Sequence, residues 1–279
     1  MKKIRITAYW ILLLFTGVNL HAQTSSQPPS PEELTVPLSQ PGKPYSLNIA
    51  LVNGSIKVTS YPGKDIIIEA SSRNGNKKEM PEDAGNGMKR ISPKNGFEIT
   101  AKEENNNITI ENKQPSKLVD LSLKIPQDVT LKLSTINNGE IDVDNIRGEL
   151  EINNVNGSIK LTNISGSAVA STVNGTLTAV FNAIDPKSPM AFSTLNGNVD
   201  LTLPATAKAS LKLRSDRGEI LTDFDVSMEK AQKTDKTEQT HPGMYQMKLD
   251  DWILCKIGGG GPEILMKNMN GNIYIRKTK

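Results

Sequence analysis

Glycine recurs in this chain at a fixed spacing, and that repeat limits the possible folds more than any other feature. Five glycines follow one another every nine residues, namely Gly139, Gly148, Gly157, Gly166 and Gly175. Alternate members carry a fuller Asn-Gly motif, so the complete repeat is 18 residues long, and it lengthens to 22 and then 21 residues at Gly197 and Gly218. The motif also opens the body of the chain at Asn53-Gly54 and closes it at Asn270-Gly271. A fixed period of this length is typical of stacked structural repeats.

The residues after each Asn-Gly motif alternate between apolar and polar. Ile141 and Val143 stand two and four places after one glycine, and Ile159 and Leu161 take the same places one repeat later. A period of two predicts a strand with one buried face, and Asn-Gly readily adopts positive φ, which predicts a sharp corner before each strand. Because units of the same sense stack most simply in parallel, we expect like residues to lie above like.

These patterns predict an all-β fold, a single-stranded parallel β-solenoid with coils of 18–22 residues. Gly148 and Gly166, which lie midway between the Asn-Gly motifs, would turn the chain onto the opposite wall. Two walls nine residues apart enclose a thin interior that suits aliphatic side chains better than aromatic ones. The aromatic content of only 4% agrees with such an interior.

The first residues of the chain predict an exported protein. Residues 1–22 combine three basic residues, a short apolar stretch and a plausible cleavage site, as in a signal peptide, and no segment is apolar over the length that a membrane-spanning helix needs. Removing the signal leaves 33 − 3 = 30 basic residues against 30 acids, so we expect no nucleic-acid partner. We expect a periplasmic or surface location, with a Pro-rich extended leader at 23–44 and a solenoid domain at 45–279 that has loop excursions near 73–96 and 226–243.

The Asn-Gly pairs are candidate structural corners. Their amides could in principle bind a ligand, but Asn tolerates positive φ and stacked amides can hydrogen-bond from coil to coil, which favours the structural interpretation. The predicted corner residues are Asn53, Gly54, Asn138, Gly139, Asn156, Gly157, Asn174, Gly175, Asn196, Gly197, Asn270 and Gly271.

A group of acids provides the best candidates for chemistry. The group comprises Glu140, Asp142, Asp144, Glu149 and Glu151. Such carboxylates could bind calcium or act as an acid/base pair on a carbohydrate. One coil later, however, Lys160 is expected to stand above Asp142, an arrangement typical of a solvated cross-strand ladder. With one cysteine and two histidines in the chain, we assign no catalytic residue, no cofactor and no metal site.

Three aromatic residues near the end of the chain are candidates for a contact patch. Tyr245, Trp252 and Tyr274 lie within 30 residues of one another. Aromatic side chains are enriched in binding surfaces, although they could equally cover an open end of the stack. The partner and the oligomeric state stay open.

The repeated unit V-N-G-S-I-K-V, at residues 52–58, and the final G-N-I-Y-I-R-K resemble a bacterial exported β-strand-repeat family of unknown function that is labelled "putative adhesin". This resemblance implies a β-strand-repeat fold, and the family supplies no catalytic residues. We therefore expect a non-enzymatic, adhesin-like interaction or scaffold protein of the cell envelope, with an envelope polymer or an envelope protein as partner. The alternative is a carbohydrate-active β-solenoid enzyme, a lyase or hydrolase that uses the outward carboxylates.

Overall fold

A computed structural model describes residues 32–72, 96–229, 236–241, 244–248 and 252–279. These residues form strands joined by turns, and no helix occurs among them, so the expected all-β class is confirmed. Accordingly, the described part of the chain contains no helix that could cross a membrane. The predicted signal peptide and most of the excursion near 73–96 lie outside these residues.

The strands are β1 (Glu32–Pro37), β2 (Tyr45–Asn53), β3 (Ile56–Ser60), β4 (Asp65–Ser72), β5 (Ile99–Glu104), β6 (Asn107–Asn112), β7 (Val119–Ile125), β8 (Val129–Asn137), β9 (Ile141–Asp144), β10 (Arg147–Asn156), β11 (Ile159–Asn174), β12 (Leu177–Ile184), β13 (Met190–Asn196), β14 (Val199–Leu203), β15 (Ala209–Ser215), β16 (Ile220–Thr222), β17 (Val226–Met228), β18 (Lys236–His241), β19 (Met244–Lys248), β20 (Ile253–Ile257), β21 (Glu263–Asn270) and β22 (Ile273–Lys277). β18 and β19 form a separate two-stranded sheet.

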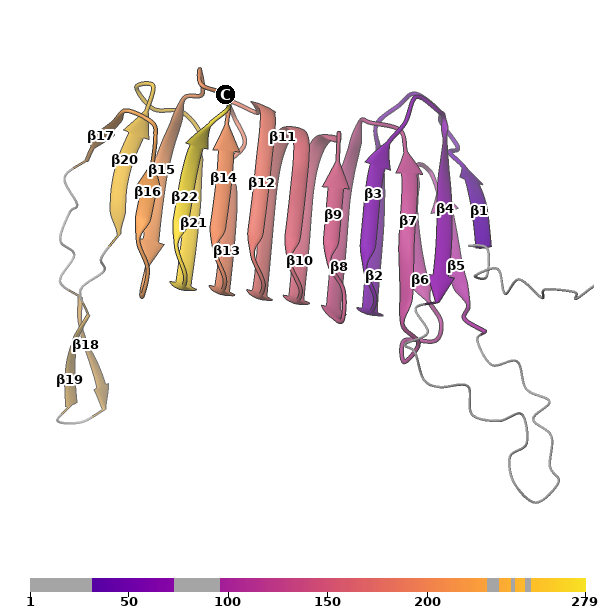
Figure 1. Ribbon diagram of the computed structural model, residues 1–279, viewed down its shortest axis with the longest axis horizontal. Coiled ribbons are helices and arrows are strands. Elements are labelled where there is room, and N and C mark those ends of the chain that lie inside the picture. Colours follow the sequence, from indigo (N-terminus) through magenta and orange to yellow (C-terminus); the bar gives the residue numbers. More distant parts are fainter. Residues whose placement is uncertain (1–31, 73–95, 230–235, 242–243, 249–251) are drawn as a thin grey trace, which may run out of the picture. The chain divides into compact units, whose positions relative to one another are not determined.

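The other twenty strands form one sheet that folds back on itself as two walls. The first wall runs in the order β1, β4, β7, β3, β9, β11, β12, β14, β22 and β16, and the second in the order β5, β6, β2, β8, β10, β11, β13, β21, β15, β20 and β17. β11 belongs to both, because its first part pairs with β9 and β12 and its last part with β10 and β13. A coil is one strand of the second wall followed, after a corner, by one strand of the first (Figure 1).

The pairing is parallel in the middle of the stack and antiparallel toward both ends. Asn156 pairs with Asn174 in parallel, for example, at the 18-residue offset of the repeat. At one end β4 pairs antiparallel with β1 and β7, and at the other β20 pairs antiparallel with β15 and β17. β5 and β6 also form a hairpin, whose turn residues Asn105 and Asn106 both have positive φ, as a tight hairpin turn requires. The sheet is therefore mixed, whereas the sequence predicted parallel pairing throughout.

The order of the coils in the stack differs from their order in the sequence. β2–β3, the first coil, lies between the coils β6–β7 and β8–β9. β21–β22, the last coil, lies between β13–β14 and β15–β16. The Asn53 and Asn270 motifs come first and last in the sequence, but in the structure they lie within the stack and not at its ends. The motif allows this order because its corners stay in register wherever a coil is inserted, and Asn53 pairs with Asn137 and Asn270 with Asn196.

The turns from the first wall to the second lie slightly before the glycines that were expected to make them. Asn145 and Asn163, with φ of 57° and 56°, form these turns. Gly148 and Gly166 follow within β10 and β11, and a Cβ on either would come within 2.1 Å of the carbonyl oxygen of the neighbouring coil. Asparagine thus makes the turn and glycine permits the close approach that follows.

The core is one cluster of aliphatic side chains between the walls, joined by the edge-to-face pair Phe181 and Phe192 at 6.1 Å between ring centroids. It also takes in Val36 and Leu38, because residues 32–37 form strand β1. The second half of the segment expected to be an extended leader thus belongs to the folded body.

Candidate interaction surface

A column of glycines forms one corner of the stack. Its order is Gly54, Gly139, Gly157, Gly175, Gly197, Gly271 and Gly218, and a Cβ on each of the last six would lie 1.7–2.2 Å from the carbonyl oxygen of the glycine before it. No side chain fits in that space, so each corner requires glycine. The structure thus places the predicted glycines, together with Gly218, in one continuous corner.

A ladder of asparagine amides runs beside the glycine column. Nδ2 of each asparagine donates to Oδ1 of the asparagine in the next coil, at 2.7–3.2 Å, through the series Asn270, Asn196, Asn174, Asn156 and Asn137. Asn137, rather than the predicted Asn138, holds the ladder position, because Asn138 is the inserted residue of this corner, with φ of 57°. Asn53 instead donates to the carbonyl of Pro115 at 2.8 Å.

A second, buried row of polar side chains was missed by the sequence analysis. In six coils the residue three places before the corner glycine, or four at Gly139, donates to the glycine carbonyl of the neighbouring coil, at 2.6–3.1 Å. These donors are Thr135, Asn154, Thr172, Thr194, Asn268 and Ser215. A buried carbonyl without a partner is costly, so this row completes the corner. Its signal in the sequence is a Thr, Asn or Ser at this place in every regular repeat.

The candidate acids are separated along the first and second walls. Asp142 stands in register with Lys160 on one side, as expected, and with Lys57 on the other, because the first coil is inserted there. Asp144 accepts a hydrogen bond from Asn163 Nδ2 at 2.9 Å. Two lysines beside one carboxylate favour a charge ladder over an acid/base pair.

The remaining acids also face solvent. Glu151 forms an ion pair with Lys132 at 2.9 Å on the second wall, and Glu140 and Glu149 are exposed. Within the described ranges, no three His, Cys, Asp or Glu side chains gather as they would around a metal ion. An open hollow lies beside the glycine column, and it is lined by Ser55, Asn138, Gly139, Glu140, Asn156 and Gly157.

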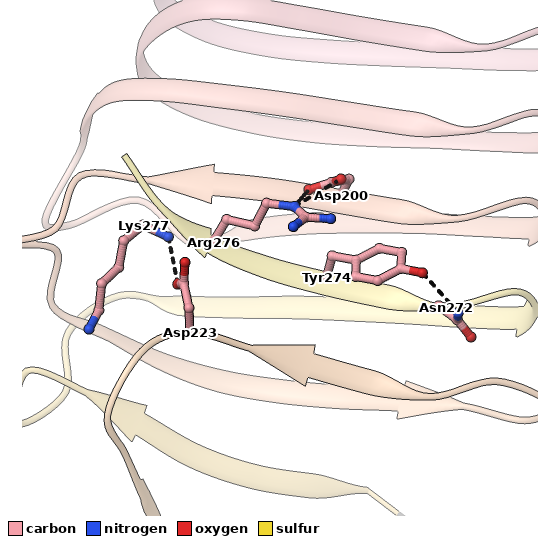
Figure 2. Close-up of polar contacts among 6 residues, drawn as sticks. All are labelled: Asp200, Asp223, Asn272, Tyr274, Arg276 and Lys277. Atoms are coloured by element: carbon pink, nitrogen blue, oxygen red, sulfur yellow. Dashed lines mark hydrogen bonds and ion pairs between the residues drawn. The ribbon is translucent and has the colours of Figure 1, made fainter. Parts of the chain in front are cut away.

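A charged and aromatic cluster lies on the first wall around β22 (Figure 2). The Arg276 guanidinium donates through Nε to the two carboxylate oxygens of Asp200, at 2.9 and 3.1 Å, and its Cζ lies 4.9 Å from the centre of the Tyr274 ring. The hydrogen bond to Asp200 raises the pKa of Arg276. The Tyr274 hydroxyl in turn accepts from Asn272 Nδ2 at 2.9 Å. Tyr274 is therefore held in place from both sides, half-buried on the outer face.

The three aromatic residues predicted as a patch do not form one surface in the described structure. Trp252 lies on the second wall, where Lys212 Nζ is 5.0 Å and Arg214 Cζ 5.9 Å from the ring centre. Tyr274 lies on the first wall, in β22. Tyr245 belongs to β19, of which only the backbone is described.

The chain is similar to a protein family and to solved structures. Residues 127–250 match the family model described as Toastrack DUF4097. No curated protein matches the chain. A putative cell adhesion protein from Clostridium sporogenes is similar in structure, with 14% identity, 89% of this chain and 100% of that chain covered, and a TM-score of 0.49. A putative adhesin from Bacteroides fragilis shows 11% identity, with 90% and 98% covered and a TM-score of 0.33.

The family match ends at residue 250, whereas the stack includes β21 and β22, which are inserted between coils of the matched region. The boundary of the match is therefore not a boundary of the structure. Residues 127–250 are therefore similar to the Toastrack DUF4097 family, whose function is unknown, and the resemblance to a β-strand-repeat family is thereby confirmed.

Proposed function

We propose that this chain is an exported, non-enzymatic interaction or scaffold protein of the cell envelope. In this proposal the coils form a β-solenoid whose outer wall lies against an extended partner, either an envelope polymer or an envelope protein. The observation that carries it is the register of the first wall, where outward side chains of successive coils form one continuous row. That row consists of Lys57, Asp142, Lys160, Thr178, Asp200 and Tyr274.

The geometry of this row favours an extended partner over a small molecule. Small ligands bind in concave, mostly apolar pockets, whereas the row runs across paired strands and is lined by charges and hydroxyls. The hollow over Glu140, Asp142 and Lys160 is open to solvent and is the kind of surface that another flat or linear surface can cover. Regular spacing also allows a repetitive partner to make the same contact several times, which adds avidity.

Export is supported by the beginning of the sequence and by the single cysteine. Residues 1–22 have the charged, apolar and cleavage regions of a signal peptide. Cys255 is 4% exposed, and its burial raises the pKa of the thiol, so it is poorly reactive. A buried lone thiol suits an oxidising compartment outside the cytoplasm, because it does not form mixed disulfides readily.

The enzyme alternative has weaker support in the geometry. A carbohydrate-cleaving pair of carboxylates must flank one bond, with one group protonated as the acid. Asp142 instead lies in register between two lysines, and Asp144 accepts a hydrogen bond from Asn163, so each carboxylate already has a partner on the wall.

The proposal is tested with the exported protein, purified after its natural processing. It is incubated with insoluble peptidoglycan and, separately, with a detergent extract of envelope proteins, and both sedimentation and new reducing ends are measured. We expect capture without new reducing ends, and weaker capture of Lys160→Glu. Lys132→Glu, on the second wall, is the matched control and should bind as the native chain does. New reducing ends that disappear in Asp142→Asn would move the protein into the enzyme class, and failure to bind either probe would reject the interaction.

A further inference from the structure

A row of exposed aliphatic side chains crosses the second wall. The residue immediately before each ladder asparagine, and before Asn53, is apolar and points outward. We call this row the apolar ridge, and its members are Val52 (38% exposed), Ile136 (44%), Val155 (37%), Val173 (37%), Leu195 (41%) and Met269 (37%).

The register of the strands makes the ridge continuous. The asparagines that follow its members pair between β2 and β8 and across β10, β11, β13 and β21. Between β8 and β10 the strand pairing ends two residues earlier, and Asn156 Nδ2 donates to Asn137 Oδ1, so each ridge residue lies beside the ridge residue of the next coil. Six strands at a spacing of about 4.8 Å give a ridge roughly 24 Å long.

The coil itself does not require an apolar residue at this place. The first wall has outward positions of the same kind, and there Lys57, Asp142 and Lys160 follow one another in register. In the second wall the ridge is aliphatic in all six coils. Contiguous exposed apolar surface of this kind is costly in water and marks a site of contact.

A row of small residues runs beside the ridge on the same face. It lies two places earlier in each strand, and because the side-chain period of a strand is two, both rows face outward. Its small members are Ala50, Ser134, Asn153, Ser171 and Ser193, and we call these five the trough, whereas Lys267 takes the same place in the sixth strand, β21. Ser171 Oγ and Asn153 Oδ1 are hydrogen-bonded at 2.7 Å, which holds the two side chains against the wall.

We propose that the second wall binds a second copy of this chain. A two-fold axis that lies between the two facing walls and runs parallel to the ridge would place the ridge of each copy over the trough of the other. The contact is self-complementary, because ridge and trough are adjacent and parallel over five coils, as an isologous interface requires. A second copy is the favoured occupant because its strands have the same spacing of about 4.8 Å. Each ridge side chain would then pack on a trough residue of the other copy, as in a dry interface between paired sheets.

The size of the surface fits a weak dimer. Six aliphatic side chains that are about two-fifths exposed provide roughly 400 Å² of apolar surface per copy. With the trough, the total buried area is about 1,000–1,200 Å², at the lower end for a specific interface. We therefore expect a dissociation constant in the micromolar range, on the order of 1–100 μM. This inference goes beyond the proposed function and does not depend on it, since the partner there lies on the first wall.

The test compares two substitutions on the same strand. Val173→Lys changes the ridge at the second wall, and Thr162→Lys changes an outward, half-buried residue of β11 at the first wall. Sedimentation velocity from about 1 μM to 1 mM should show a monomer–dimer equilibrium for the native chain and for Thr162→Lys. Val173→Lys should raise the dissociation constant at least tenfold, while circular dichroism shows that both variants keep the native strand content.

A second measurement keeps the inference testable if Val173→Lys unfolds. Val173→Cys should give a covalent dimer with a short thiol cross-linker, and Thr162→Cys should not, because Cys255 is buried and does not compete. A native chain that stays monomeric to 1 mM, or a dimer that Val173→Lys leaves unchanged, would overturn the proposal. It would also be overturned if the native chain were monomeric and captured envelope proteins, and Val173→Lys lost that capture. The ridge would then bind a different partner.

Discussion

Asn154 is the residue whose replacement tests the corner chemistry most directly. Its Nδ2 donates to the carbonyl of Gly139 at 3.0 Å, but its Oδ1 is buried without a hydrogen-bond partner among the described residues. The neighbours in register, Thr135 and Thr172, make the same bond with a hydroxyl. Asn154→Thr keeps the donor and removes the unpaired carbonyl oxygen, so we expect it to stabilise the protein.

The magnitude follows from the cost of the unpaired group. A buried polar atom without a partner costs about 1–3 kcal/mol, and threonine also suits a strand better than asparagine. The smaller volume of threonine offsets part of this gain, so the net stabilisation is about 1–2 kcal/mol. For a domain of this size that raises Tm by roughly 2–8 °C.

The reciprocal substitution supplies the control. Thr172→Asn introduces an amide oxygen in the position where Asn154 Oδ1 of the neighbouring coil has no hydrogen-bond partner. It should lower the free energy of unfolding by a similar amount. Urea unfolding followed by circular dichroism measures both variants and the native chain at one pH. If Asn154→Thr is less stable than the native protein, the packing of each site, and not the orphan oxygen, decides the stability of the corner.

Three further predictions concern the corner, the acids and pH. Gly157→Ala should lower the free energy of unfolding by more than about 3 kcal/mol, because its Cβ would lie 1.9 Å from a carbonyl oxygen. Asp142→Ala should lower it by less than about 1 kcal/mol. Equal urea midpoints for the two variants would contradict the glycine column. Hydrogen bonds from the Ser39 hydroxyl and from a backbone N–H lower the pKa of Glu103 below 4.5, so its contribution to stability is present above pH 4.5 and is lost as the pH falls through the lowered pKa. Glu103→Gln should therefore lose less Tm than the native chain between about pH 5 and pH 3. A chelator should leave Tm unchanged, and a clear fall would instead identify the acids at 140–151 as calcium ligands.

Much of the local structure could be predicted from the sequence, because it depends on short-range chemistry. The Asn-Gly pairs and the period of two fixed the corners and the strands, and the 18-residue offset correctly placed Lys160 beside Asp142. The buried row of polar side chains that includes Thr172 also has a signal in the sequence. Thr and Ser are so common in strands, however, that their repeated position does not by itself indicate a buried hydrogen bond.

The order of the coils could not be predicted in the same way. The motif at Asn53 is equally suited to stack on any other coil, and nothing local indicates that its neighbour is Asn137 rather than the next coil in sequence. The antiparallel ends were missed for a related reason. The hairpin turn at Asn105 and Asn106 lies outside the repeat, and the repeat alone indicates parallel strands. The ridge likewise appears only when the neighbours of Val173 are known.

The insertion of the first and last coils has a consequence for how the chain reaches its native state. β2 leaves the ribosome early, but its partner β8 begins at Val129, about 80 residues later. At the other end, β13 and β15 are left with a missing neighbour until β21, ending at Asn270, has been made. Such long sequence separations slow folding, and an unpaired strand edge is prone to associate with other chains in the meantime. A nascent chain of this protein therefore carries unpaired edges on β2 and one open slot between β13 and β15, and a chaperone that shields strand edges would act there until synthesis is complete.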